Sequence, residues 1–228
     1  MNSFIAIGTI IGTVIIFFGM TKLYKLIPFP LLVPIATTTL VIIIGLLLFS
    51  IPYETYMLGG KWIDELLGPA VVALAYPLYH NRNALKAYFK PIFIGVIVGS
   101  TAGVLSGLYL AKLFSVSPVV LFSLAPKSVT SPVAMDIADV IGGVPALAAV
   151  YVMIAGIGGA MFGPILLKIT KVDHYIGVGL GLGTASHGIG TAKALEMGTN
   201  EGAISSVAMI LSAIYTAIIL PVLVGLFI

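Results

Sequence analysis

Long, uninterrupted apolar runs limit the folds open to this chain more than any other feature. Five runs have the ~17 or more residues that an α-helix needs to cross the ~30 Å hydrocarbon layer of a bilayer. Backbone polar groups in lipid must be paired internally, and these runs do not alternate apolar with polar residues, so they predict helices rather than barrel strands. The five runs are residues 4–20, 31–50, 91–113, 144–167 and 203–228.

The composition excludes a soluble monomer. Hydrophobic residues make up 60% of the 228 positions and charged residues 8%, whereas an ordinary soluble domain carries about 25% charged residues. The net charge of +3 is small, and its basic residues form no stripe with interleaved aromatics, so no nucleic-acid partner is expected. The chain has no cysteine, which removes disulfides and thiolate metal sites from consideration. Because so few residues are charged, the expected surrounding of the chain is the lipid bilayer.

Three further apolar segments are too short or too interrupted to be clean spans. The segment 66–79 is too short to cross the bilayer and contains two prolines. The segment 119–141 is interrupted by Pro126 and Pro132, and the segment 175–197 contains a glycine-rich stretch. Unwound backbone at membrane depth is tolerated only where it lines a cavity or is buried in protein. Broken apolar segments of this kind are typical of transporter binding sites.

These patterns predict an all-α, polytopic membrane protein with about five full spans and three short, broken or re-entrant segments. Residues 1–228 are expected to form a single integral membrane domain. Glycines spaced three or four apart on the 91–113 and 144–167 runs mark a candidate pseudo-repeat of 61–113 and 118–170, which would be inverted if each unit crosses an odd number of times. Close packing of membrane helices explains the same glycines without a repeat.

The first broken stretch has the features of an anion site. Ser131 and Pro132 form a helix-start signal, with serine as the N-cap and proline at the first helical position. The amides and dipole at a helix N-terminus attract anions, and Lys127, Ser128 and Thr130 lie just upstream to add charge and hydroxyl donors. The alternative is a packing kink with the lysine reaching to the membrane interface.

The second broken stretch, residues 183–191, offers hydroxyls and one imidazole. Its glycines are expected to allow positive φ and close backbone approach, and its histidine supplies a group that can titrate near neutral pH. We expect this stretch to face residues 129–132 across a polar cavity; a purely structural glycine turn is the alternative. The predicted substrate-binding residues are Thr184, Ser186, His187, Gly188, Gly190 and Thr191.

Two carboxylates follow the first broken stretch. Asp136 and Asp139 are three residues apart and fall on one helical face. Burial and like charge would raise the pKa of each, as in a proton-coupling site, so ion coupling is assigned to Asp136. In the alternative, the helix lies near the outer interface and both acids are in water.

Enzyme activity is not expected. Ser186 and His187 are adjacent rather than facing, and the sequence has no G-x-S-x-G, H-E-x-x-H or phosphate-loop motif. No metal or cofactor is therefore predicted.

Three motifs in order resemble the LrgB/CidB family. They are PKSVTSPVAM at 126–135, GTASHGIGTA at 183–192 and, upstream, LGPAVVALA at 67–75. The resemblance implies a multi-pass protein of the bacterial inner membrane, encoded beside a small holin-like partner of the LrgA/CidA type. Members are described as holin- or antiholin-like regulators of murein hydrolases and autolysis, and as carriers of small carboxylates such as pyruvate. The family is similar to the membrane half of the plastid glycolate/glycerate translocator, and its members often carry Glu where this chain has Asp136.

Residues and resemblance together predict a carrier of small organic monocarboxylates of the pyruvate, glycolate, glycerate or lactate class, with a midplane site between broken helices. The alternative is a holin/antiholin-like regulator of murein hydrolase activity that acts with a small membrane partner. Gly156, Gly159 and Gly163 predict a close-packed helix face, and through it a homodimer.

Overall fold

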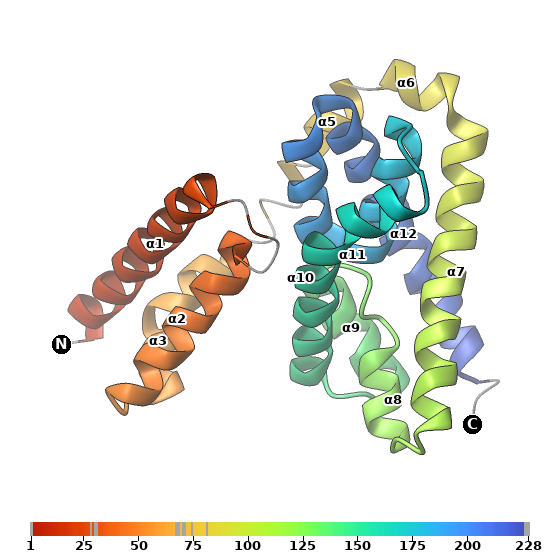
Figure 1. Ribbon diagram of the computed structural model, residues 1–228. Coiled ribbons are helices and arrows are strands. Elements are labelled where there is room, and N and C mark those ends of the chain that lie inside the picture. The colour runs from red at the N-terminus through yellow and green to blue at the C-terminus, as the bar shows by residue number, and fades with distance from the viewer. Residues whose placement is uncertain are drawn as a thin grey trace. The chain divides into compact units, whose positions relative to one another are not determined.

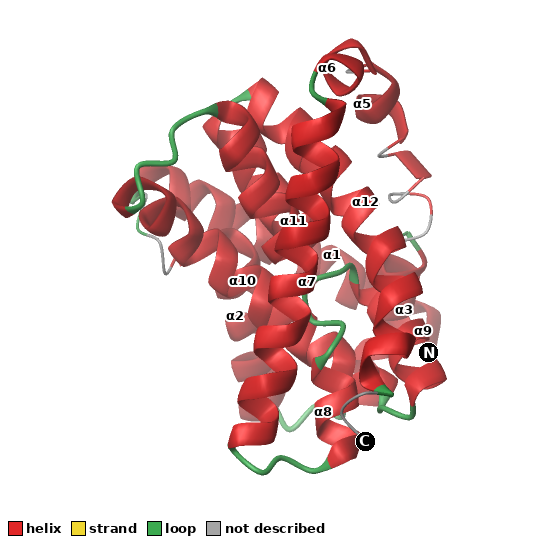
Figure 2. Cartoon of the chain, turned by 90° about the vertical axis from the view of Figure 1, so that its right-hand side faces the viewer, coloured by secondary structure: helices red, strands yellow, loops and turns green. Residues whose placement is uncertain are grey.

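The computed structural model describes residues 2–27, 29, 32–66, 69, 72–73, 75–80 and 82–225, and within these ranges every regular element is a helix (Figure 2). The all-α prediction is confirmed. The chain divides into two compact units, Met1–Ala75 and Tyr76–Ile228. This boundary falls inside the first member of the candidate pseudo-repeat, residues 61–113.

The first unit contains α1 (Asn2–Leu26), α2 (Pro34–Leu48) and α3 (Tyr53–Glu65), and α1 packs against the other two. Contact between α1 and α3 is close because Gly59 has no side chain. A β-carbon on Gly59 would collide with the Thr9 hydroxyl and the Ala6 carbonyl. The hydroxyls of Thr13 and Tyr56, 3.1 Å apart, add a hydrogen bond between these helices.

The second unit is built around α11 (Tyr175–Met197), which packs against α12 (Thr199–Val224), α10 (Pro145–Ile169) and α7 (Phe89–Leu113) (Figure 1). This central position matters because α11 carries one of the predicted broken stretches. The other helices from the unit boundary onward are α5 (Ala75–His80), whose first residue belongs to the first unit, α6 (Arg82–Ala87), α8 (Pro118–Leu124) and α9 (Ser131–Ile141).

Four helices of the described chain are long and apolar enough to cross a membrane: Ser3–Leu26, Phe89–Leu113, Pro145–Ile169 and Thr199–Val224. The apolar run 31–50, expected to be a fifth span, forms the 15-residue helix α2, which is ~22 Å long at 1.5 Å per residue. Pro34 stands at the start of this helix, and Ser50 adopts a positive φ of 51° just beyond its end. The run is therefore shorter as a helix than as an apolar sequence.

Two of the three predicted interruptions are present. Residues 119–141 form two helices, α8 and α9, separated by residues 125–130. Residues 175–197 form α11, whose helical dihedrals fail at Ser186 and His187. The third segment, 66–79, lies partly outside the described residues, and its described end belongs to α5.

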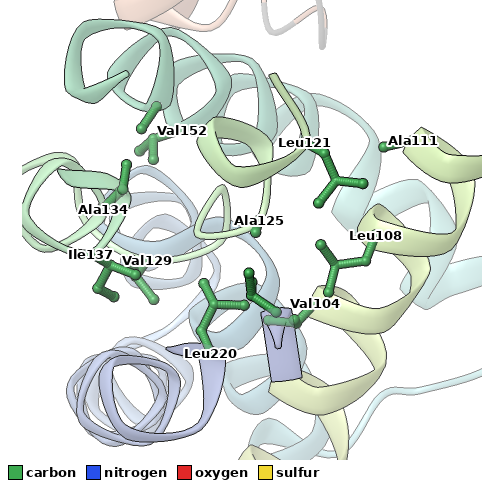
Figure 3. Packing of buried hydrophobic residues seen from close by; sticks show 13 residues of the cluster. Val104, Leu108, Ala111, Leu121, Ala125, Val129, Ala134, Ile137, Val152 and Leu220 are labelled. Atoms are coloured by element: carbon green, nitrogen blue, oxygen red, sulfur yellow. The ribbon is translucent and has the colours of Figure 1, made fainter. Parts of the chain in front are cut away.

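The connection between α8 and α9 is part of the core. Ala125 and Val129, each 1% exposed, join a cluster of buried apolar side chains from α7, α8, α9, α10 and α12 (Figure 3). Apolar anchors at both positions fix the connection, so its polar residues have defined places against the neighbouring helices.

Candidate functional site

The break in α11 is centred on two polar residues rather than on a glycine. Ser186 has φ −132° and ψ 15°, and His187 has φ 42° and ψ −133°. The sequence predicts positive φ at the glycines of this stretch, and this is wrong: the left-handed φ belongs to His187. Since L side chains rarely adopt such a φ, His187 is held there by its surroundings.

The surroundings that hold His187 come from α10. The His187 side chain is 4% exposed, and its Nε2 lies 3.0 Å from the backbone oxygen of Val152 on α10. Because a carbonyl only accepts, Nε2 carries the hydrogen of this bond. A β-carbon on Gly156 would lie 2.6 Å from Nε2, and one on Gly159 would collide with the Ser186 hydroxyl. Two glycines of α10 therefore form the gap that holds the break.

This packing corrects the predicted dimer face. The sequence predicts a close-packed face at Gly156, Gly159 and Gly163, and through it a homodimer. Instead Gly156 and Gly159 receive His187 and Ser186, and a β-carbon on Gly163 would lie 2.7 Å from a methyl group of Leu182. The face is filled by α11 of the same chain, so these glycines do not point to a second copy; the homodimer itself stays a prediction.

The threonines of α11 have hydrogen-bond partners inside the unit. Thr184 Oγ1 donates to the Leu180 oxygen at 2.6 Å, one helical turn back. The Thr191 hydroxyl lies 2.9 Å from the His187 oxygen and 2.9 Å from Ser205 Oγ on α12. The bond between Thr191 and Ser205 ties the second half of α11 to α12.

The two glycines after His187 differ in their surroundings. A β-carbon on Gly190 would collide with the Leu182 carbonyl and lie 2.6 Å from Ser186 Cβ. On Gly188 it would only reach Met209 Sδ at 3.9 Å, an ordinary contact. The steric role predicted for both positions therefore belongs to Gly190.

The first broken stretch starts its helix one residue earlier than predicted. Helix α9 begins at Ser131, and Thr130, with φ −67° and ψ 150°, is the N-cap residue; Pro132 follows at the second helical position. Ser131 is therefore inside the first turn. Thr130 makes no side-chain cap bond, and its Oγ1 is buried without a hydrogen-bond partner among the described residues.

Lys127 points at α7. Its Nζ donates to the Gly103 oxygen at 2.7 Å, and a β-carbon on Gly107 would lie 2.6 Å from the same nitrogen. The ammonium therefore occupies the space that a side chain at position 107 would fill. The neighbouring Ser128 also meets this helix, 3.7 Å from a β-carbon on Gly103.

The two broken stretches lie on neighbouring turns of α7. A β-carbon on Gly99 would lie 3.2 Å from Thr184 Oγ1, while Gly103, four residues on, faces Ser128. Four helical residues rise ~6 Å. The hydroxyls of Thr184 and Ser128 are thus on one face of α7, a turn apart; the polar cavity between the stretches stays a prediction.

The carboxylates after Thr130 are directed away from the core. Asp136 and Asp139 are exposed, whereas Ala134, Ile137 and Ala138 on the same helix are buried. Proton coupling by Asp136 stays a prediction. No cluster of three or more His, Asp or Glu side chains that could hold a metal occurs in the described part of the chain.

The sequence did not predict which groups contact the site residues of the two broken stretches. Gly107, the Val152 carbonyl and Ser205 complete the surroundings of Lys127, His187 and Thr191. The available signal was the four-residue spacing of Gly95, Gly99, Gly103 and Gly107, which marks one face of a helix. It predicts close packing but does not say which residue fills each gap.

Long apolar helices packed around two interrupted segments, which carry buried polar side chains such as Ser186 and His187, define a multi-pass membrane protein. Within that class, the chain belongs to the LrgB-like family, which it matches over residues 13–226. It is 48% identical over 223 residues to the uncharacterized protein YxaC of Bacillus subtilis (strain 168), covering 98% of this chain and 97% of YxaC. It is 37% identical over 228 residues to the holin-like protein CidB of Staphylococcus aureus (strain N315), covering 100% of both chains. No solved structure matches the chain.

Proposed function

We propose that the chain acts as a holin-like membrane protein that regulates murein hydrolase activity and autolysis from the bacterial cell membrane. The observation that carries this proposal is the identity of 37% with holin-like CidB over the whole of both chains. The four long apolar helices support a bilayer location for that action. A small holin-like membrane protein of the LrgA/CidA type is the proposed partner.

The test is a lysis assay in a bacterium from which its own member of the family has been deleted. Expression of this chain should change the rate of autolysis and the extracellular murein hydrolase activity, and co-expression of a small holin-like partner should enlarge the change. A membrane-inserted chain that leaves both rates at the level of the empty vector would overturn the proposal.

A second candidate function is carriage of a small organic monocarboxylate such as pyruvate, glycolate, glycerate or lactate. The observation that favours it is the placement of Thr184 and Ser128 on neighbouring turns of α7. Polar, interrupted helices inside an apolar bundle are typical of carriers that bind solute at the midplane. A protein that acted only through its assembly would have no need of two such segments.

Proteoliposomes that contain this chain alone separate the two candidates. A carrier should take up labelled pyruvate or lactate with saturation, should show counterflow exchange, and should retain a trapped fluorescent dye. A pore should release the dye. A regulator that needs its partner should neither take up the labelled carboxylate nor release the dye. Coupling by Asp136 would appear as uptake driven by an inward pH gradient, lost in Asp136→Asn while exchange remains.

A further inference from the structure

The long apolar helices α7 and α10 repeat at a fixed interval along the chain. Helix α7 spans Phe89–Leu113 and α10 spans Pro145–Ile169, so the start and the end of the helix both recur after 56 residues. Three residues of α7 also have an identical residue 56 positions later: Gly103 and Gly159, Gly107 and Gly163, Lys112 and Lys168. Equal bounds and matching residues indicate an internal duplication.

The backbone that ends each helix repeats at the same interval. Ser115 and Lys171, 56 residues apart, have positive φ of 53° and 57°, a conformation that residues other than glycine rarely adopt. In both places the following valine amide donates to an oxygen five residues back, at 3.0 Å after α7 and 2.9 Å after α10. Both helices therefore close with the same Schellman geometry, which supports the duplication independently of residue identity.

Each of these helices is followed by one of the two broken segments. The last residues of α9 and α11 are again 56 residues apart. The hydroxyl residues at the two turns match at the same interval: Ser128 with Thr184, and Thr130 with Ser186. The repeated unit is thus a long apolar helix plus a broken segment, at residues 89–141 and 145–197. This pairing is offset from the candidate pseudo-repeat of 61–113 and 118–170.

The two copies run in opposite directions. The first half of α11 faces both long helices, in ascending residue order on α7 and in descending order on α10. The facing pairs are Gly95 with Leu180 and Gly99 with Thr184 on α7, and Gly159 with Ser186 and Gly163 with Leu182 on α10. Since one segment is parallel to α7 and antiparallel to α10, these two helices are antiparallel. The duplication is therefore inverted.

Helix α11 turns back on itself at its break. A β-carbon on Gly190 would collide with the carbonyl of Leu182, eight residues earlier, whereas eight residues of a straight helix rise ~12 Å. The two halves of α11 are therefore folded against each other. Residues 175–197, which we name the second hairpin, thus begin and end on the same side of the unit.

The first broken segment also begins and ends on one side. We name residues 118–141 the first hairpin; it starts beyond the end of α7 and finishes before the start of α10, and in antiparallel helices these ends lie on one side. Ser123 Oγ accepts from the Val144 amide at 2.8 Å, which joins α8 to the start of α10. In between, Lys127 reaches the Gly103 oxygen, and Figure 1 shows α8 and α9 beside the lower half of α7.

We infer that the two hairpins are gates on opposite sides of the membrane, opened one at a time. A unit and its inverted copy can exchange conformations, so a state with one hairpin tightly packed implies a second state with the other tightly packed. The present packing is unequal: a β-carbon on Gly159 would collide with the Ser186 hydroxyl, but one on the equivalent Gly103 would lie 3.7 Å from Ser128 Oγ. The second hairpin is the one packed tightly here.

The gates deepen the carrier candidate, and their purpose rests on it, because a carrier must open its site to each side in turn. The test measures the accessibility of thiols and not uptake. A protein that opens as inferred but takes up no carboxylate would exclude the carrier function alone, so the two failures are distinguishable.

The first experiment establishes from which side each hairpin enters. The chain has no cysteine, so single cysteines can be labelled by a membrane-impermeant maleimide in right-side-out and inside-out vesicles without background. Ser117 and Asp139 are exposed near the two ends of the first hairpin, and Asp173 and Asn200 near those of the second. Ser117→Cys and Asp139→Cys should label from one side, and Asp173→Cys and Asn200→Cys from the other. Labelling of all four from one side, or of the two ends of one hairpin from different sides, would overturn the inference.

The second experiment locks one gate. The hydroxyls of Thr191 and Ser205 are 2.9 Å apart, so the double variant Thr191→Cys/Ser205→Cys, once oxidised, ties the second hairpin to α12. Thr184→Cys is the reporter, because this residue is 7% exposed and lies beside the break. It should label slowly from the side on which its hairpin enters, and the lock should slow it at least about tenfold, since a buried thiol reacts only while the segment is open.

A matched lock controls for the disulfide itself. The hydroxyls of Ser100 and Ser212 are 2.8 Å apart, and oxidised Ser100→Cys/Ser212→Cys joins α7 to α12 while both hairpins stay free. It should leave the labelling of Thr184→Cys unchanged. Equal labelling rates with and without the hairpin lock would overturn the inference. If a locked variant fails to fold, single Ser128→Cys and Thr184→Cys proteins decide: labelling of both from one side, or of neither, also overturns it.

Discussion

Glycines recur at helical spacing both in α1 and in the two helices that hold α11, yet they do different things. A β-carbon on Gly8 or Gly12 of α1 would have nothing within 4 Å. A β-carbon on Gly107 of α7, or on Gly156 or Gly159 of α10, would strike the side chain of a residue from a broken segment. The same residue type leaves an open face on α1, within its own unit, and a filled gap in α7 and α10.

The difference shows how a polar break can be buried in an apolar bundle. A glycine inside a helix costs about 0.5–1 kcal/mol relative to alanine. In α7 and α10 that cost is offset, because each gap lets a neighbouring side chain reach its place: Lys127 bonds the Gly103 oxygen and His187 bonds the Val152 oxygen. In α1 no such compensation is present within its unit.

The largest expected effect is at the gap for Ser186. Gly159→Val should lower the free energy of unfolding by ~2–3 kcal/mol, because the new side chain overlaps the Ser186 hydroxyl and forces the break out of place. Gly158→Val is the matched control: a β-carbon there meets nothing within 4 Å, so the change should stay within ~0.5 kcal/mol. Melting of the purified chain in detergent measures both, and equal losses would show that the gap is not specific.

A second pair of variants separates the glycines after His187. Gly190→Ala should destabilise the chain by ~1–3 kcal/mol, because the methyl group meets the Leu182 carbonyl and Ser186. Gly188→Ala should cost less than ~0.5 kcal/mol, since only Met209 is near. Chemical unfolding, followed by far-ultraviolet circular dichroism, measures the stability of both variants. A larger loss at Gly188 would mean that the break is held differently.

A smaller effect is expected where the break is tied to α12. Thr191→Val keeps the side-chain shape but removes the hydroxyl that contacts Ser205 and donates to the His187 oxygen, at a cost of ~1–2 kcal/mol. Thr170→Val removes a bond of the same kind from an exposed residue at the end of α10. It should change the melting temperature much less. Similar shifts in both variants would argue against a structural tie at Thr191.

The smallest effect, of opposite sign, is expected in α1. Gly12→Ala should raise the free energy of unfolding by about 0.5–1 kcal/mol, because alanine favours the helix and the space is open. The measurement compares thermal melting of Gly12→Ala and Gly107→Ala. A clear destabilisation by Gly12→Ala would mean that another helix packs closely on this face in the assembled protein.

Much of the fold could be read from the sequence because lipid leaves few choices. Continuous apolar runs that must pair their own backbone groups become helices, and four of the five predicted spans are long helices. Prolines and glycines inside polar stretches located the interruptions between α8 and α9 and within α11. These are local properties of chain and solvent, so no knowledge of neighbours was needed.

Only the tertiary structure decided what each residue at the breaks does. That His187 rather than a glycine takes the positive φ follows from the space at Gly156 and the Val152 carbonyl, both on another helix. Gly107 contacts the ammonium of Lys127, whereas Gly12 has open space beside it. This difference depends on which segment packs against each helix. Glycine spacing records that a helix face is smooth, but steric fit and hydrogen bonding between distant segments determine what fills it.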